Sequence, residues 1–121
     1  MRLYIATKWE NRKAAKRFME DMENQGHVIT YNWTISEQAS EEQAIKDLAG
    51  VINCDALVFL AEEEYPYTGA LIEVGAAMGL GKPVYVIGSA SVTRTLFFKH
   101  PLVRHGVDTF IEEVLHGEKV R

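Results

Sequence analysis

Residues 56–87 read ALVFLAEEEYPYTGALIEVGAAMGLGKPVYVI, and this stretch decides the fold. Two short apolar runs, ALVFL at 56–60 and VYVI at 84–87, flank a segment at 70–80 that is apolar almost all the way round a helix. Strands without polar alternation are typical of a parallel sheet that is buried on both faces. A helix that is apolar on every side is itself buried. The stretch therefore predicts two buried parallel strands joined by a buried helix.

The alternation of strand and helix extends towards the N-terminus. Residues 3–6 form a short apolar run, and residues 11–25 repeat apolar side chains at helical spacing. Gly26 is placed to end this helix in a left-handed cap, and residues 27–31 follow as a second strand. The N-terminal quarter of the chain thus predicts one strand, one helix and another strand.

Ser40 and Gln43 have the spacing of a capping box, and the apolar repeat behind them predicts a helix that ends near residue 53. On the other side of the deciding stretch, residues 89–106 indicate a long polar loop, and residues 108–115 an amphipathic helix. We therefore predict a doubly wound α/β fold: a flavodoxin-like or Rossmann-like parallel sheet of four to five strands with helices on both faces. Function in such sheets lies at the carboxyl ends of the strands.

Composition narrows the classes of protein and partner. The 121 residues are 47% hydrophobic and 25% charged, which predicts a single globular domain over residues 1–121. The net charge of -4 carries no basic stripe, so a nucleic acid polymer is not an expected partner. Cys54 is the only cysteine, and neither a leader pattern nor a membrane-length apolar run is present in the sequence. We expect a cytoplasmic protein without a membrane partner.

Glu73 is the sharpest anomaly, because it lies inside the apolar helical segment ALIEVGAAMGL. An ionised carboxylate there costs several kcal/mol unless it is partnered or faces a cleft. The ordinary alternative is a glutamate in the first turn or so of a helix that begins near Thr68, where the helix dipole favours negative charge. Position alone leaves both interpretations open.

Two further residues have ordinary interpretations when each is considered by itself. Asp47 lies at the edge of an apolar helix stripe, where a solvated carboxylate beside Lys46 is the simplest interpretation. Tyr4 lies inside the first strand, where a core aromatic is the simplest interpretation.

Taken together, these residues match a family pattern. The segments LYIATKW, DLAGVINCDALVFL and TGALIEVGAAMGLGKPV resemble the nucleoside 2-deoxyribosyltransferase superfamily, which includes deoxynucleoside-monophosphate N-glycosidases. The resemblance implies that Glu73, in the pattern of a glutamate helix, is the nucleophile. It implies that Tyr4 orients this carboxylate and that Asp47 contacts the substrate and assists the departing base. Trp9 occupies the place of a tryptophan that borders the base.

The resemblance also implies a set of substrate contacts. Before the glutamate helix the family commonly has an acidic or hydroxyl residue, and Tyr67 occupies that place, where it would shrink the pocket, stack on a ligand or act as a lid. Amides at the start of the helix are able to hold an anion such as a phosphate. The expected substrate-binding residues are Trp9, Thr7, Lys8, Tyr67, Thr68, Gly69, Ser89 and Ser91.

In the family a neighbouring subunit completes the site. We therefore expect a homodimer or higher homo-oligomer in which residues 89–106 reach the partner's site, with Ser89 or Ser91 near a 5' group and the exposed-looking Phe97 and Phe98 at the interface.

Breaking an N-glycosidic bond builds positive charge on the sugar and negative charge on the base. A carboxylate below the anomeric carbon and a proton donor at the base address both charges. We predict a hydrolase or transferase of a nucleoside or nucleotide that retains configuration and needs no metal and no organic cofactor. His100 and His105 lack the companions of a metal site and are read as surface histidines.

Two alternatives stay open at this point. The first is a protein that binds a nucleotide without turnover on the same fold. The second is a glycohydrolase of NAD or another ADP-ribosyl compound. The base, the sugar, the need for a 5' phosphate and the acceptor are equally open.

Overall fold

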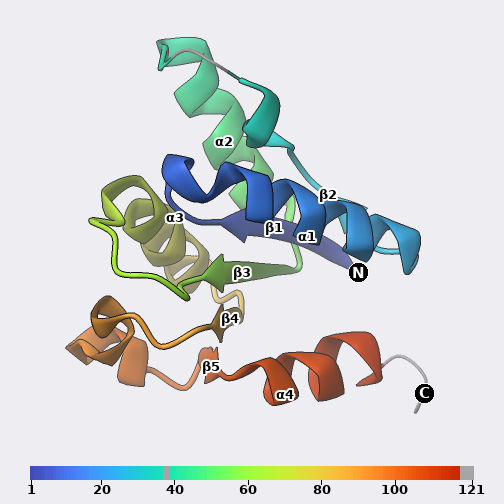
Figure 1. Ribbon diagram of the computed structural model, residues 1–121, viewed down its shortest axis with the longest axis vertical. Helices are drawn as coiled ribbons and strands as arrows, with labels where there is room; N and C mark the ends of the chain where they lie inside the picture. The colour runs from blue at the N-terminus through green and yellow to red at the C-terminus, as the bar shows by residue number, and fades with distance from the viewer. Residues whose placement is uncertain (37–38, 118–121) are drawn as a thin grey trace.

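Five parallel strands form one sheet in the computed structural model, which describes residues 1–36 and 39–117 (Figure 1). Residues 37–38 and 118–121 of the predicted domain lie outside this description. The sheet order is β2-β1-β3-β4-β5, which is the flavodoxin-like order. The strands are β1 (Arg2–Ala6), β2 (Val28–Ile29), β3 (Ala56–Leu60), β4 (Val84–Ile87) and β5 (Val103–His105).

Burial of the central strands confirms the interpretation of the apolar runs. Every residue of β3 is buried, and this strand lies between β1 and β4 in parallel register, with Tyr4 beside Leu57 and Leu57 beside Val84. The neighbouring strands β1 and β4 also carry fully buried side chains, among them Leu3, Ile5 and Val86. Lack of alternation in these strands thus reflects apolar contact on both faces of the sheet.

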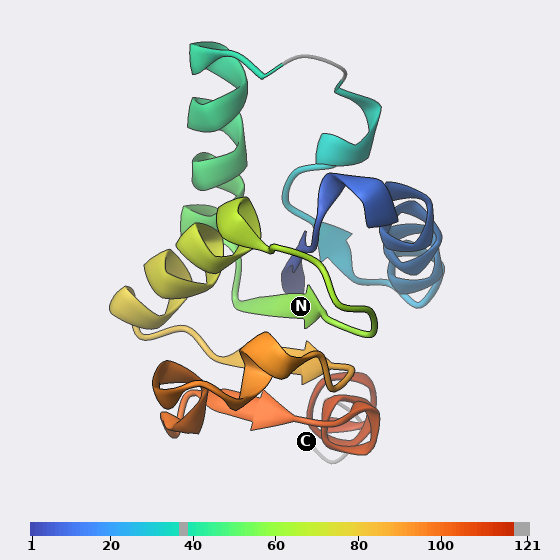
Figure 2. The same ribbon diagram turned by 60° about the vertical axis from the view of Figure 1, so that its left-hand side comes forward.

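Helices cover both faces, as Figure 2 shows. One face carries α2 (Glu41–Asn53) and α3 (Thr68–Gly79). The other carries α1 (Arg12–Asn24) and the C-terminal helix, where α4 (Val107–Phe110) continues as the π-helical turn η5 (Ile111–Leu115). Phe18 of α1 and Phe110 of α4 have ring centroids 5.7 Å apart, so these two helices contact each other on the same face of the sheet. Within the described ranges, no helix has the length and apolar character needed to traverse a lipid bilayer.

Both ends of α2 are fixed by side chains. Ser40 accepts the backbone N–H of Gln43 at 3.1 Å, which confirms the predicted N-terminal cap. At the other end, the Lys82 ammonium donates to the carbonyl oxygens of Val51 (3.2 Å), Ile52 and Cys54 (2.6 Å). A cation on the last carbonyl groups complements the helix dipole. The helix that bears Asp47 is therefore tied at its C-terminus to the segment leading into β4.

Residues 89–106 differ from the predicted long polar loop. They contain two 3-10 turns, η3 (Ser91–Arg94) and η4 (Leu96–Lys99), and then the edge strand β5. Phe98 is only 5% exposed and packs on Phe59 at a centroid distance of 5.9 Å, whereas Phe97 is 73% exposed. The prediction that both aromatics are exposed was wrong for Phe98. The edge strand was missed because two of its three residues are polar and exposed, which leaves no apolar run.

Candidate active site

A cleft of about 410 Å³ opens at the carboxyl ends of β1 and β3. After β1 the chain continues to one face of the sheet, and after β3 to the other. The two connections therefore diverge and leave the crevice in which such folds bind ligands. The segments after β1 and β2, together with α2 and α3, supply its walls. The lining residues are Thr7, Trp9, Trp33, Ala44, Asp47, Leu48, Gly69, Ala70, Ile72 and Glu73.

Glu73 is held by Tyr4 in this cleft. The Tyr4 hydroxyl donates to Glu73 Oε2 at 2.5 Å, which is the hydrogen bond expected between these residues. Tyr4 is fully buried in β1, so its ring fixes the position of the donor. Glu73 is the sixth residue of α3, beyond the first turn, and its partner is a side chain of another element. The helix-start interpretation of Glu73 therefore does not account for its surroundings.

Burial controls the protonation of this pair. The pKa of Glu73 is raised to about 7: burial is the largest cause, the hydrogen bond from Tyr4 opposes it, and the negative charge of Asp47 adds to it. Desolvation therefore outweighs the hydrogen bond, which favours the ionised form. Burial and the adjacent Glu73 also raise the pKa of Tyr4, so the phenol remains a donor. Near neutral pH the Glu73 carboxylate is poised between its two forms.

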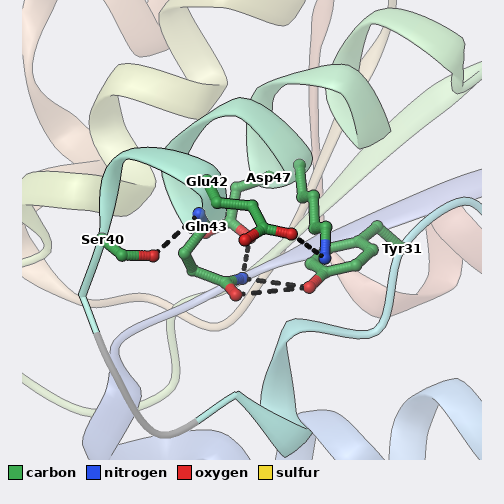
Figure 3. A network of polar contacts seen from close by, with 6 residues as sticks. Tyr31, Ser40, Glu42, Gln43 and Asp47 are labelled. Carbon is green, nitrogen blue, oxygen red and sulfur yellow. Dashed lines mark hydrogen bonds and ion pairs between the residues drawn. The ribbon is translucent and has the colours of Figure 1, made fainter.

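Asp47 lies on the α2 wall of the same cleft. Its Oδ1 accepts a hydrogen bond from Gln43 Nε2 at 2.7 Å, whereas Lys46 pairs with Glu42 at 2.9 Å (Figure 3). Burial raises the pKa of Asp47, and the hydrogen bond from Gln43 partly offsets this. Asp47 is therefore half-buried and bonded to Gln43, while Lys46 is bonded to Glu42.

Gly50 allows α2 to approach the Tyr4 ring. A Cβ atom at Gly50 would lie 2.8 Å from Tyr4 Cδ1 and 2.9 Å from Tyr31 Cβ, closer than side-chain contacts permit. Asp47 and Gly50 are three positions apart, on one side of the helix. The glycine is what brings the Asp47 side of α2 against the strand that carries Tyr4.

Two tryptophans form the aromatic wall. Trp9 is 40% exposed, and its ring centroid lies 6.4 Å from that of Trp33, which is buried and donates its indole N–H to the carbonyl of Ile5 at 2.6 Å. Arg12 lies over the Trp9 ring at 4.6 Å. Trp33 was not among the predicted site residues. Its position after the second strand was the available signal, since loops at the carboxyl ends of parallel strands meet at one edge of the sheet.

Tyr67 does not line the cleft. It is 2% exposed, its hydroxyl donates to the carbonyl of Glu63 at 2.5 Å, and its ring packs edge-on against Phe59 at 5.0 Å. The structure contradicts the prediction that Tyr67 stacks on a ligand or covers the site. The Tyr67 ring is part of the hydrophobic core and does not narrow the cleft.

The other predicted contacts divide into two groups. Thr7, Trp9 and Gly69 line the cleft, and Thr7 Oγ1 donates to the carbonyl of Leu60 at 2.7 Å, which joins the ends of β1 and β3. Four residues do not line it, and their contact with substrate stays a prediction. Ser91 is bound to Glu64 through its hydroxyl and amide, and Ser89 lines a second pocket of about 570 Å³. The four residues are Lys8, Thr68, Ser89 and Ser91.

Across residues 1–36 and 39–117, no three His, Cys, Asp or Glu side chains converge on a point that would hold a metal ion. His105 Nε2 lies 2.8 Å from the carbonyl of Phe98, and the buried Cys54 thiol lies 3.0 Å from the carbonyl of Val51.

Fold and cleft first define the class: a flavodoxin-like α/β protein with two carboxyl groups in a ligand cleft at the switch point of its sheet. The chain belongs to the nucleoside 2-deoxyribosyltransferase family, whose model matches residues 3–108. Among solved structures, the Clostridium botulinum CMP N-glycosidase BcmB is similar, with a TM-score of 0.63 and 17% sequence identity over 100% of each chain. That likeness shows a common fold. No curated protein matches the chain in sequence.

Proposed function

We propose that the protein cleaves the bond between base and sugar of a nucleoside or nucleotide, as an N-glycosidase or N-glycosyl transferase with Glu73 as nucleophile. One observation carries the proposal: the Glu73 carboxyl group receives the Tyr4 hydroxyl at 2.5 Å in a cleft that it shares with Asp47. Membership of the nucleoside 2-deoxyribosyltransferase family supports the same chemistry. The similar C. botulinum protein is a CMP N-glycosidase, which agrees with this chemistry.

In the first step, an ionised Glu73 oxygen forms a bond to the anomeric carbon while the carbon–nitrogen bond breaks. The electron pair of that bond leaves with the base, and the proton of a neutral Asp47 carboxyl group moves to the base. The Tyr4 hydroxyl stays hydrogen-bonded to Glu73 Oε2 while the other carboxyl oxygen attacks, so Tyr4 keeps the carboxyl group oriented during this step. The products are the free base and a glycosyl ester of Glu73.

In the second step, an acceptor oxygen or nitrogen forms a bond to the anomeric carbon, and the ester bond breaks with its electron pair returning to Glu73. The acceptor proton passes to Asp47, which restores both carboxyl groups to their starting forms. Water as the acceptor gives hydrolysis, and a second base gives transfer. Two displacements at one carbon give net retention of configuration.

The walls of the cleft fit the parts of such a substrate. Trp9 and Trp33 offer aromatic surface to a base, since stacking on an aromatic ring is favourable for every base. Gly69 and Ala70 line the cleft at the first turn of α3, where backbone N–H groups and the helix dipole favour an anion such as a 5' phosphate. We include this phosphate in the proposed substrate class.

The homo-oligomer remains part of the proposal. Leu96 and Phe97 are 72% and 73% exposed on η4, and an apolar pair of this size on the surface is suited to an interface between copies. We expect light scattering to give at least a dimer, and Phe97→Ser to reduce the measured mass. A wild-type monomer at assay concentration would remove the shared site from the proposal.

Release of free base, followed by chromatography, tests the proposed function. The panel contains nucleosides, nucleoside monophosphates and NAD, each with and without an added acceptor base, and compares wild type with Glu73→Gln and Glu73→Ala. We expect release by wild type and a loss of about 10⁴-fold or more in both variants, because the nucleophile is removed. Glu20→Gln, on the exposed face of α1, is the matched control and retains wild-type release.

A stable acceptor tests the stereochemistry. In water containing methanol, we expect a methyl glycoside with the configuration of the substrate, identified by NMR. An inverted product would argue for direct attack by the acceptor. Absence of release from every compound by wild type would favour a protein that binds its ligand without turnover.

A further inference from the structure

Gln43 has no part in the two displacement steps, yet its side chain lies between two groups at the edge of the cleft. Its Nε2 donates to Asp47 Oδ1 at 2.7 Å, one helical turn along α2. Its amide also meets the Tyr31 hydroxyl, with Nε2 at 3.2 Å and Oε1 at 3.3 Å (Figure 3). Tyr31 follows β2, and thus the contact joins two different elements. The glutamine amide links a rigid aromatic side chain to the carboxyl group proposed as the acid.

The Gln43 side chain does not take the direction that its position in the helix predicts. A glutamine at the third helical position after a serine cap commonly reaches back to the backbone N–H of the cap residue. Here Ser40 does accept the Gln43 backbone N–H, at 3.1 Å, but the side chain is directed along the helix to Asp47. The N-terminal cap therefore fixes the backbone of Gln43 and leaves its amide for the carboxyl group.

The contact distinguishes the two oxygens of Asp47. An amide N–H requires an acceptor, so a neutral Asp47 that keeps this hydrogen bond carries its proton on Oδ2. In the part of the chain that the structure describes, the hydrogen bonds of the Asp47 carboxyl group involve Oδ1 and leave Oδ2 for a ligand of the cleft. The arrangement gives a single oxygen the role of proton donor.

We propose that Gln43, braced by Tyr31, is a positioning residue that holds Asp47 with Oδ2 directed to the leaving base, an inference that rests on the proposed function. The neighbouring charged groups are bonded to other partners and do not hold Asp47. Lys46 is paired with Glu42 on the exposed side of α2, and Glu73 and Tyr4 are bonded to each other. Among the described residues, the Gln43 amide is the side-chain hydrogen-bond donor to Asp47.

A comparison of leaving groups tests the inference. Gln43→Met keeps the length of the side chain and its helix propensity but removes the amide. We expect base release from the best substrate to fall about 10-fold to 100-fold, part of the contribution of a general acid. A nitrophenyl glycoside of the same sugar should be cleaved at the wild-type rate, because its phenolate departs without a proton. We expect Tyr31→Phe to show the same selectivity with a smaller loss.

Two controls separate positioning from general damage. Gln25→Met, at the exposed end of α1, should leave both rates unchanged. In an Asp47→Asn background, Gln43→Met should cause no further loss, since residues that act through one group are not additive. Equal losses with both leaving groups, or a full loss in the Asp47→Asn background, would overturn the inference.

A readout independent of turnover keeps the inference distinct from the proposed function. The hydrogen bond from Gln43 lowers the pKa of Asp47, so Gln43→Met should raise that pKa in an NMR titration of the carboxyl carbon. If wild type releases no base, the proposed function fails while this titration still tests the contact. An unchanged pKa of Asp47 would overturn the positioning role in either case.

Discussion

Two tyrosine–glutamate pairs lie on opposite faces of the sheet, and they behave in opposite ways. On the α2–α3 face, Tyr4 donates to Glu73 at 2.5 Å; on the α4 face, Tyr85 donates to Glu113 at 3.1 Å. Burial raises the pKa of Glu73 to about 7. The Arg104 guanidinium, which binds Glu113, holds the pKa of that carboxyl group below its usual range.

The comparison shows that a tyrosine hydrogen bond does not by itself make a carboxylate reactive. The Glu113 side chain is 33% exposed and has a cation, so it is ionised over the whole physiological range. Glu73 is desolvated in the cleft, and the charged side chain that acts on it is another acid, Asp47. Desolvation without a cation is therefore what distinguishes the cleft from the structural pair.

The largest expected effect comes from removing the Tyr4 hydroxyl. Tyr4→Phe should lower kcat/KM for base release about 10-fold to 100-fold, the value of a hydrogen bond to a charged group. In wild type, kcat/KM should follow a bell-shaped pH profile with one limb at about 7, because the reaction needs an ionised Glu73 and a neutral Asp47. Tyr4→Phe removes the interaction that lowers the pKa of Glu73, so this limb should move to higher pH. Full pH profiles of both proteins measure the shift.

Tyr85→Phe is the matched control for that change. It removes the corresponding hydroxyl from the pair on the other face, and it should leave the pH profile of base release where it is in wild type. A shift of equal size in both variants would mean that the profile reports global stability rather than the ionisation of Glu73.

The next effect concerns stability. The folded pKa of Glu73, about 7, lies above its ordinary value of 4.5, so the folded state binds the proton more tightly than the unfolded state. The contribution of Glu73 to stability is therefore greatest at low pH and is lost as pH rises through about 7. Glu73→Gln should be more stable than wild type by up to about 3 kcal/mol near pH 8 and about equal near pH 5, measured by urea unfolding. A gain that is the same at both pH values would contradict the buried titration.

The smallest effect belongs to the exposed pair. Arg104→Met removes the main cause of the lowered pKa of Glu113, so that pKa should rise towards its ordinary value in an NMR titration. Base release should not change, because neither residue lines the cleft. An altered rate would mean that the two faces of the sheet are coupled.

Much of this molecule was predictable from sequence because its signals are local. Unbroken apolar strands, a capping serine and Gly26 with a positive φ of 92° each follow from a few adjacent residues. The site was predicted from a family resemblance that linked Tyr4, Asp47 and Glu73, three residues with ordinary interpretations when each is considered separately. Only the folded chain brings Asp47 and Glu73 into one cleft, with Tyr4 bonded to Glu73.

The features that sequence did not predict depend on contacts between distant segments. Tyr67 appeared to be a pocket residue, and only its packing on Phe59 shows that it belongs to the core. Trp33 reaches the cleft through a hydrogen bond to Ile5 in another element. Gln43 had the signature of a helix cap. In the folded chain its side chain instead donates to Asp47 and contacts Tyr31, which lies outside the helix.

The aromatic wall of the cleft has an optical consequence. The chain contains two tryptophans, and both line this one pocket, 6.4 Å apart. Intrinsic fluorescence excited at the red edge of the absorption band thus originates entirely from the cleft, without emission from a distant indole. Occupancy can be followed without a label, and in a Glu73→Gln protein the titration would measure affinity free of turnover. The protein carries its own ligand sensor in the wall of its site.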